Sequence, residues 1–167
     1  GPCVNHLMVD AAPPSKGPVI MNDEATPQVI AHIIKHEALI ADKRQEIEAL
    51  ARGMVMATLI APEANTPALR AQVKDFEDRH RVLKGFYQAH IDHSTYMIKL
   101  FKAFLAIDIP RVKVCYGLIK ANIFSVEDYM RDATKYGYFT QQEYKTHTER
   151  FMEEVEMWSI LDEITIS

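Results

Sequence analysis

Cysteine and glycine are scarce in this chain of 167 residues, which contains two cysteines and six glycines. Two cysteines cannot form the dense disulfide framework of small secreted domains. One of them, Cys115, lies in an apolar helical pattern, which favours a buried and inert thiol. The chain also has no glycine-rich phosphate loop, Gly-x-Ser-x-Gly, Cys-x-x-Cys or His-Glu-x-x-His sequence. The motifs of the common nucleotide-binding, hydrolytic and redox enzymes are therefore missing.

Long apolar runs and strand-like patterns are missing as well. The most apolar stretches, 53–61 and 100–109, fall well short of the ~20 residues of a membrane-spanning helix. No alternating pattern of useful length predicts a β-strand. With 48% apolar residues, 25% charged residues and a net charge of −4, the composition is that of an ordinary globular domain with no overall attraction to nucleic acid.

The segment from Thr66 to Ile109 contains one glycine, Gly85, and no proline after Pro67. Residues spaced alternately by three and four positions form a helical seam that is apolar at both ends and polar in the middle: Leu69, Val73, Phe76, His80, Leu83, Tyr87, His90, Ser94, Met97, Phe101 and Phe104. Such a helix would be roughly 60 Å long, about twice the width of a small domain.

A second long helix is predicted before it. Thr26-Pro27 and Thr66-Pro67 have the same signature, a hydroxyl residue at the N-cap followed by proline in the first turn. The first helix should extend to about Ala61, with a core stripe at Ile33, Ile40, Ile47 and Met54. Because only residues 62–66 join the two helices, they must form an antiparallel hairpin.

Three shorter helices are expected to follow. The first covers residues 111–121, the second begins at a near capping box at Ser125 and ends at Gly137, and the third begins at the capping box of Thr140. The third should bury Tyr144, Phe151, Val155 and Trp158. The predicted fold is therefore all-α: an elongated antiparallel helical hairpin packed by three shorter helices, a helical bundle over residues 26–167 after a flexible tail at 1–25.

Two histidine pairs, His32 with His36 and His90 with His93, have the spacing that puts both members on one helix face. In an antiparallel hairpin turning near residue 64, His36 faces about residue 92, so the pairs meet in one layer. Four imidazoles favour a transition metal such as zinc, copper, nickel or iron. The alternative is structural: His80 and His90 are polar seam positions that fix the register. No other cofactor is expected.

Charge is unevenly distributed along the chain. Residues 67–124 carry ten Lys and Arg against five Asp and Glu, whereas residues 125–167 carry four against ten. The basic residues are spread along the helix rather than clustered with aromatic and glycine residues, so they should pack beside the acidic segments. Nucleic acid is not an expected partner.

The first residues of the chain indicate where in the cell the protein is located. Gly1-Pro2 resembles the remnant of a cleaved fusion tag. Cys3, followed by a spacer rich in proline and small residues, resembles the lipid-carrying first residue of a mature bacterial lipoprotein. This predicts a periplasmic protein anchored in the membrane only through Cys3. In the alternative, Met21 is the true start and the protein is cytoplasmic.

We therefore expect a non-enzymatic helical module for protein–protein interaction, an accessory or assembly component of a bacterial envelope complex. One alternative is a metal-binding bundle that uses His32, His36, His90 and His93 for sensing, storage or catalysis. Another is a cytosolic helical regulator. The hairpin has more apolar seam than three short helices can cover, so self-association or a partner helix is expected along its Leu69–Leu83 end.

Overall fold

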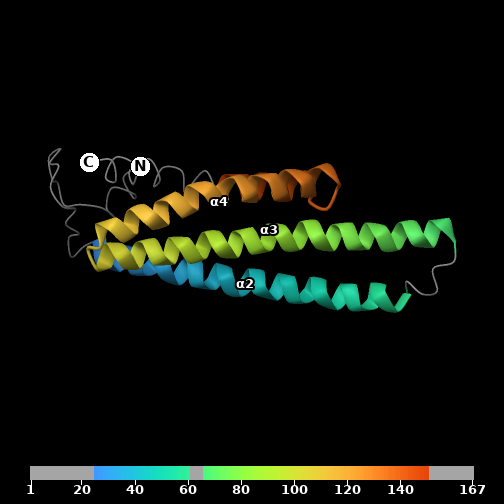
Figure 1. Cartoon of the computed structure of the whole chain (residues 1–167), viewed down its shortest axis with the longest axis horizontal. Helices are drawn as coiled ribbons and strands as arrows, with labels where there is room; N and C mark the ends of the chain where they lie inside the picture. The colour runs from blue at the N-terminus through green and yellow to red at the C-terminus, as the bar shows by residue number, and fades with distance from the viewer. Residues whose placement is uncertain (1–24, 61–65, 151–167) are drawn as a thin grey trace.

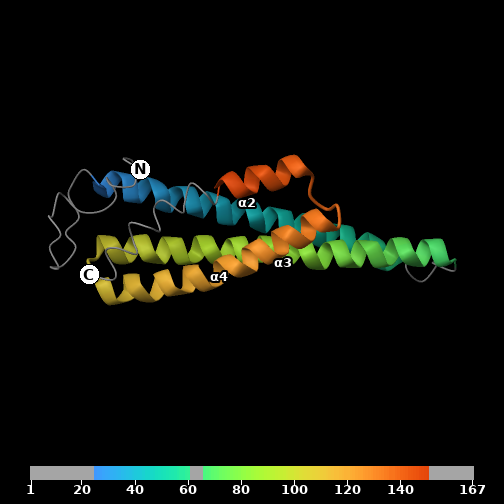
Figure 2. The ribbon, with the colours of Figure 1, turned by 90° about the horizontal axis from the view of Figure 1, so that it is seen from above.

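The computed structural model describes residues 25–60 and 66–150. Within them every regular element is a helix: α2 (Ala25–Ile60), α3 (Pro67–Leu105), α4 (Ile109–Lys135) and a further helical segment at 141–150. The predicted all-α fold with a long antiparallel hairpin is confirmed. α3 lies between α2 and α4 (Figure 1). The segment 141–150 turns back toward the side of α2 (Figure 2).

α3 begins as the sequence predicts. The side chain of Thr66 accepts a hydrogen bond from the backbone N–H of Leu69 at 3.2 Å, and Pro67 occupies the first turn. The helix is continuous for 39 residues through Gly85. Gly85 instead allows α4 to approach, because a Cβ atom there would overlap the ring of Tyr129. The predicted long, unbroken helix is thus confirmed.

α3 ends at Leu105, four residues before the predicted boundary at Ile109. Ile107 has a φ of 55°, and its N–H donates to the carbonyl of Phe104 at 3.0 Å. The N–H of Asp108 donates to the carbonyl of Ala103 at 2.9 Å. This pair of bonds is a Schellman motif, which satisfies the last carbonyls of a helix and stops it. Asp108 then caps α4 by accepting from the N–H of Arg111.

α4 corrects one prediction. The sequence suggested a break between 121 and Ser125, yet α4 is one continuous helix of 27 residues. The reason is its buried stripe, which continues across the expected break through Ile119, Val126 and Met130. Burying these residues outweighs the local preference of Ser125 for a cap. Two helical units, α4 and 141–150, therefore stand where three short helices were expected.

The turn after α4 confirms two predictions. Gly137 has a φ of 76°, and the N–H of Tyr138 donates to the carbonyl of Ala133 at 2.7 Å, so Gly137 ends the helix in the left-handed conformation. Thr140 and Glu143 form a reciprocal capping box, with both hydrogen bonds at 3.0 Å.

The core consists of two clusters along α3. One joins the beginning of α2, the end of α3 and the beginning of α4: Val29, Ile33, Met97, Leu100, Phe101, Ala103, Phe104, Val112, Cys115, Tyr116 and Ile119. The other lies near the turn after α4: Val82, Leu83, Phe86, Ala89, Val126, Met130, Ala133 and Phe139. Of the stripe predicted on α2, Ile33 is buried, whereas Ile40, Ile47 and Met54 are half-buried.

The expected packing of the basic segment 67–124 beside the acidic segments stays a prediction, because residues 151–167 lie outside the described residues. The ion pairs found within the described ranges join residues one to four positions apart, such as Arg81 with Asp78 and Arg131 with Asp128. Most of these side chains are exposed, and such pairs contribute little to stability.

Candidate functional site

The predicted meeting of histidines across the hairpin is confirmed for His36 and His93. Their ring centroids lie 6.1 Å apart in an edge-on arrangement. His36 is 1% exposed, and its Nδ1 lies 3.1 Å from the hydroxyl oxygen of Ser94. His32 stacks on Phe101 with centroids 5.4 Å apart. We call His32, His36, His93 and Ser94 the histidine layer. It lies one to two residues from the position predicted by counting back from the loop.

His90 lies three positions before His93 on α3 and has a different set of ring contacts. The ring of His90 packs edge-on against Phe86, with centroids 4.8 Å apart, and lies 5.9 Å from the ring of His147. The ring contacts of His90 thus differ from those of His36 and His93, although His93 acts electrostatically on His90.

The described part of the chain contains no group of three or more His, Cys, Asp or Glu side chains placed to hold a metal ion. A transition metal bound by His32, His36, His90 and His93 stays a prediction. Cys3, the predicted lipid-carrying residue, and Phe151, Val155 and Trp158 lie outside the described residues.

Sequence reasoning missed a second polar group in the interior. Lys43 of α2 is 6% exposed, and its Nζ lies 5.5 Å from the ring centroid of Tyr87 and 3.4 Å from a carboxylate oxygen of Asp42. His147 lies against two phenylalanines, with centroid distances of 5.0 Å to Phe86 and 5.2 Å to Phe139. We call Lys43, His90 and His147 the basic cluster. Spacing from Tyr144 gave no signal for His147, because Tyr144, which the sequence predicted to be buried, is 36% exposed.

Burial and positive charge keep the two imidazoles of the basic cluster neutral. Burial lowers the pKa of His90 to about 2, and the charge of Lys43 is the next largest cause. Burial lowers the pKa of His147 to about 4, helped by Lys43 and Arg150 and opposed by Glu143. Burial also raises the pKa of Tyr87 to about 12, with Glu46 contributing. These three groups are thus uncharged at neutral pH.

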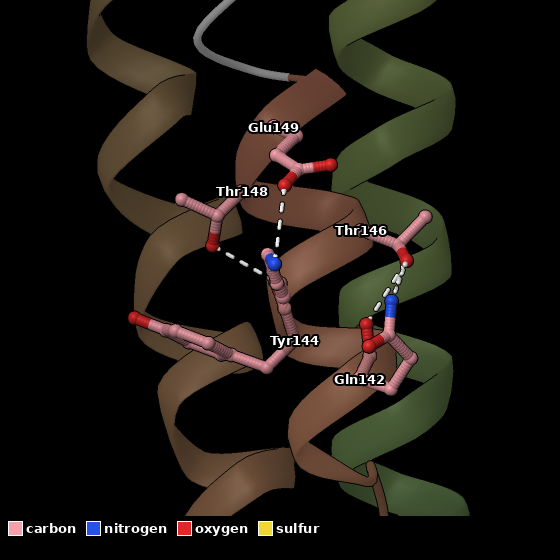
Figure 3. A network of polar contacts seen from close by, with 6 residues as sticks. Gln142, Tyr144, Thr146, Thr148 and Glu149 are labelled. Carbon is pink, nitrogen blue, oxygen red and sulfur yellow. Dashed lines mark hydrogen bonds and ion pairs between the residues drawn. The ribbon is translucent and has the colours of Figure 1, made fainter.

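The remaining polar contacts of residues 141–150 lie within the segment itself (Figure 3). The hydroxyls of Thr146 and Thr148 donate to the carbonyls of Gln142 and Tyr144, each at 2.9 Å. Lys145 and Glu149 form an exposed ion pair at 4.0 Å. These contacts stabilise the helix itself, whereas the ring of His147 contacts α3 through Phe86 and His90, at centroid distances of 5.0 and 5.9 Å.

The far end of the hairpin carries a different feature. Residues 50–60 of α2 and 67–81 of α3, which we call the outer hairpin, extend past the turn that follows α4 (Figure 1). A groove of about 530 Å³ lies between the two helices there, lined chiefly by apolar side chains that include Met56, Leu69, Val73 and Phe76. Large apolar residues are exposed beside it, with Leu59 at 67%, Met56 at 60% and Phe76 at 49%.

Cys115 is 4% exposed, and burial raises the pKa of its thiol, which fits the inert packing role predicted for it. None of the helices in the described ranges combines the length and the apolar character needed to cross a bilayer. No protein-family model, curated protein or solved structure matches this chain.

Proposed function

We propose that this protein is a non-enzymatic interaction module whose outer hairpin binds a helix of another protein. The observation that supports the proposal is the exposed apolar seam at the outer hairpin. Contiguous exposed apolar surface on a folded domain is typical of an interaction site, and apolar grooves between helices bind the apolar face of an amphipathic helix.

The apolar seam runs along all of α3, but the helices that pack against it reach only part of its length. Leu69, Val73 and Phe76 continue the spacing of Leu83 and Met97, yet the buried residues of α3 begin only at Val82. From there on, α4 and the segment 141–150 pack against α3. A further helix in the outer groove would extend the packing that the chain's own helices provide. The outer part of α3, residues 67–81, measures about 22 Å, the length of a four-turn helix.

Photo-cross-linking in cells that produce the full chain tests the proposal. The photo-reactive residue p-benzoylphenylalanine replaces Met56 in the groove or, as a matched control, Val114, which is equally exposed (63%) but lies on α4. We expect an adduct with one other protein from position 56 and not from position 114. Phe76→Lys should abolish the adduct and leave the melting temperature nearly unchanged, because that side chain is half exposed.

Adducts from position 56 no stronger than those from position 114 would refute the proposal. An adduct of twice the chain's own mass would show that the groove binds a second copy of this chain instead of a helix of another protein. The predicted envelope location is tested separately, by asking whether Cys3→Ser moves the protein out of the membrane fraction.

A further inference from the structure

The side of α4 that points away from α3 carries exposed residues without charge. At about 100° per residue, these residues lie opposite the buried stripe of the same helix. We call them the α4 stripe: Pro110, Val114, Gly117, Leu118, Ala121 and Phe124. All six are exposed, with Val114 at 63%, Leu118 at 42% and Phe124 at 67%. The first half of α4 therefore presents apolar side chains on the face where a surface helix normally has polar ones.

The turn before α4 adds apolar side chains at the same end of the helix. Leu105 and Ile107 are 37% and 54% exposed. Ile107 has a φ of 55°, a conformation that is unfavourable for a β-branched residue. Strained residues of this kind are concentrated at functional sites. Because the side chain of Ile107 is mostly exposed, packing within the chain does not account for its presence there.

Positive charge borders the α4 stripe. By helical position, Arg111 lies on one side of it and Lys113 and Lys120 lie on the other. Arg111 is 3.5 Å from a carboxylate oxygen of Asp108. Residues 109–126 contain no Asp or Glu, and residues 99–126 contain five Lys and Arg against one Asp, although the whole chain has a net charge of −4. The stripe thus lies in a basic part of an acidic chain.

The shape and the position of the stripe indicate what kind of surface it fits. It is the convex side of a helix, and a Cβ atom at Gly117 would meet no other atom within 4 Å. A partner helix binds in a groove, whereas a convex apolar face with a basic border fits the interface of a membrane that contains anionic lipids. α4 begins at the end of α3 that is remote from the outer hairpin (Figure 1), so both surfaces can be occupied at once.

We infer that the α4 stripe and the turn before it bind the surface of a membrane that contains anionic phospholipids. Val114, Leu118 and Phe124 enter the boundary between headgroups and acyl chains, and the basic border contacts the lipid phosphates. This contact is independent of the outer hairpin and of the lipid anchor expected at Cys3. High salt distinguishes it from that anchor, because salt screens the attraction of basic residues to the lipid surface but does not remove an acyl chain.

Sedimentation with lipid vesicles tests the inference on the full chain carrying Cys3→Ser, which cannot be lipidated. We expect binding to vesicles that contain phosphatidylglycerol, and binding at least tenfold weaker to vesicles of phosphatidylcholine alone. Val114→Glu should weaken the binding more than tenfold, because it places a carboxylate within the stripe. The matched control is Val55→Glu, at an equally exposed valine of α2 (60%), which should bind like the parent chain.

Two further variants show whether the apolar side chains enter the membrane. A nitrobenzoxadiazole fluorophore attached to Leu118→Cys should become brighter on addition of phosphatidylglycerol vesicles, whereas the same fluorophore at Val55→Cys should not change. Labelling is selective because Cys115 is only 4% exposed. Ile107→Gly should weaken the binding without lowering the melting temperature, so unfolding cannot explain that loss.

Equal binding to both kinds of vesicle, equal losses in Val114→Glu and Val55→Glu, or unchanged emission from position 118 would each overturn the inference. A protein adduct from the photo-reactive residue at position 114 would also overturn it, by showing that this face binds a protein. The outer hairpin is tested at position 56, so either surface can fail its test without affecting the other.

Discussion

Ile107 is the only non-glycine residue with a positive φ in the part of the chain that the structure describes. A β-branched side chain is poorly suited to the left-handed conformation, which costs an L-residue about 1–2 kcal/mol. The conformation persists because two backbone hydrogen bonds, from Ile107 and Asp108 to carbonyls of the last turn of α3, require it. The sharp turn into α4 thus carries local strain at a single residue.

Replacing Ile107 with glycine should therefore stabilise the protein. The isoleucine side chain is 54% exposed, so little apolar burial is lost. We expect the free energy of unfolding to rise by up to about 1 kcal/mol, measured by urea denaturation. Gly137→Ala, at a φ of 76°, is the opposite control and should lower it by a similar amount. A loss of stability in Ile107→Gly would show that the side chain contributes more by packing than it costs in strain.

At the scale of the elements, the approach of α4 to α3 is set by a single glycine. Gly85 lies in the middle of α3, where glycine is about 1 kcal/mol less favourable than alanine. The ring of Tyr129 from α4 occupies the space that a Cβ atom would need. The packing of the two helices therefore depends on the absence of a side chain at this position.

A double-mutant cycle separates these two effects. Gly85→Ala should destabilise the protein because Tyr129 has to move, although alanine is the better helix former. In a Tyr129→Ala background the same change should become neutral or stabilising, by up to about 1 kcal/mol. Chemical denaturation of the four proteins measures the coupling. The same effect of Gly85→Ala in both backgrounds would mean that Tyr129 does not constrain the approach.

Docking of the segment 141–150 should depend on pH. His90 and His147 have pKa values of about 2 and 4 in the folded protein, below the value of about 6.5 in an unfolded chain. Above pH 6.5 both imidazoles are neutral in the folded and the unfolded chain, so the free energy of unfolding is not reduced by their protonation. It falls as the pH drops from 6.5 toward those values, because the unfolded chain then binds protons that the folded protein does not, at about 1.4 kcal/mol per pH unit for each group.

Circular dichroism melts at pH 7 and pH 5 measure this effect. We expect a clear fall in melting temperature for the unaltered protein and a smaller fall for His147→Phe, which keeps an aromatic ring but cannot be protonated. His80→Gln, on the half-buried outer part of α3, should behave like the unaltered protein. The same fall in His147→Phe would show that other groups cause the acid sensitivity.

At the scale of the whole molecule, residues 25–60 and 66–150 form a rod that is packed along one part and open at the other. Leu83 and Leu69 occupy equivalent positions of the same seam on α3, yet Leu83 is 3% exposed and Leu69 is 37% exposed. The difference arises because α4 and the segment 141–150 reach only as far as the turn after Gly137.

Alanine substitution of these two leucines should reveal the difference. Leu83→Ala should cost about 2–5 kcal/mol, because it leaves a cavity in a buried cluster, whereas Leu69→Ala should cost less than about 1 kcal/mol. Denaturation of the isolated protein provides the measurement. A large cost at Leu69 would indicate that the outer hairpin is already covered, by a second copy of the chain.

Local sequence determined the helices and most of their ends. Thr66-Pro67, Gly137 and the Thr140 capping box act within a single turn, so their effect can be read from neighbouring residues. The meeting of His36 with His93 also followed from the sequence, because a short loop fixes the register of an antiparallel hairpin.

Tertiary packing determined the continuity of α4 and the side chains that meet in the interior. Ser125 does not begin a helix because the burial of Val126 and Met130 outweighs a local cap. Lys43 becomes a buried cation, and His90 pairs with His147, only because the segment 141–150 folds back along the hairpin. The contacts of Lys43 with Tyr87 and of His90 with His147 join residues 44 and 57 positions apart, and these side chains carry no local signal of one another. The sequence thus determined the elements and the register of the hairpin, whereas the packing between elements determined which side chains meet in the interior.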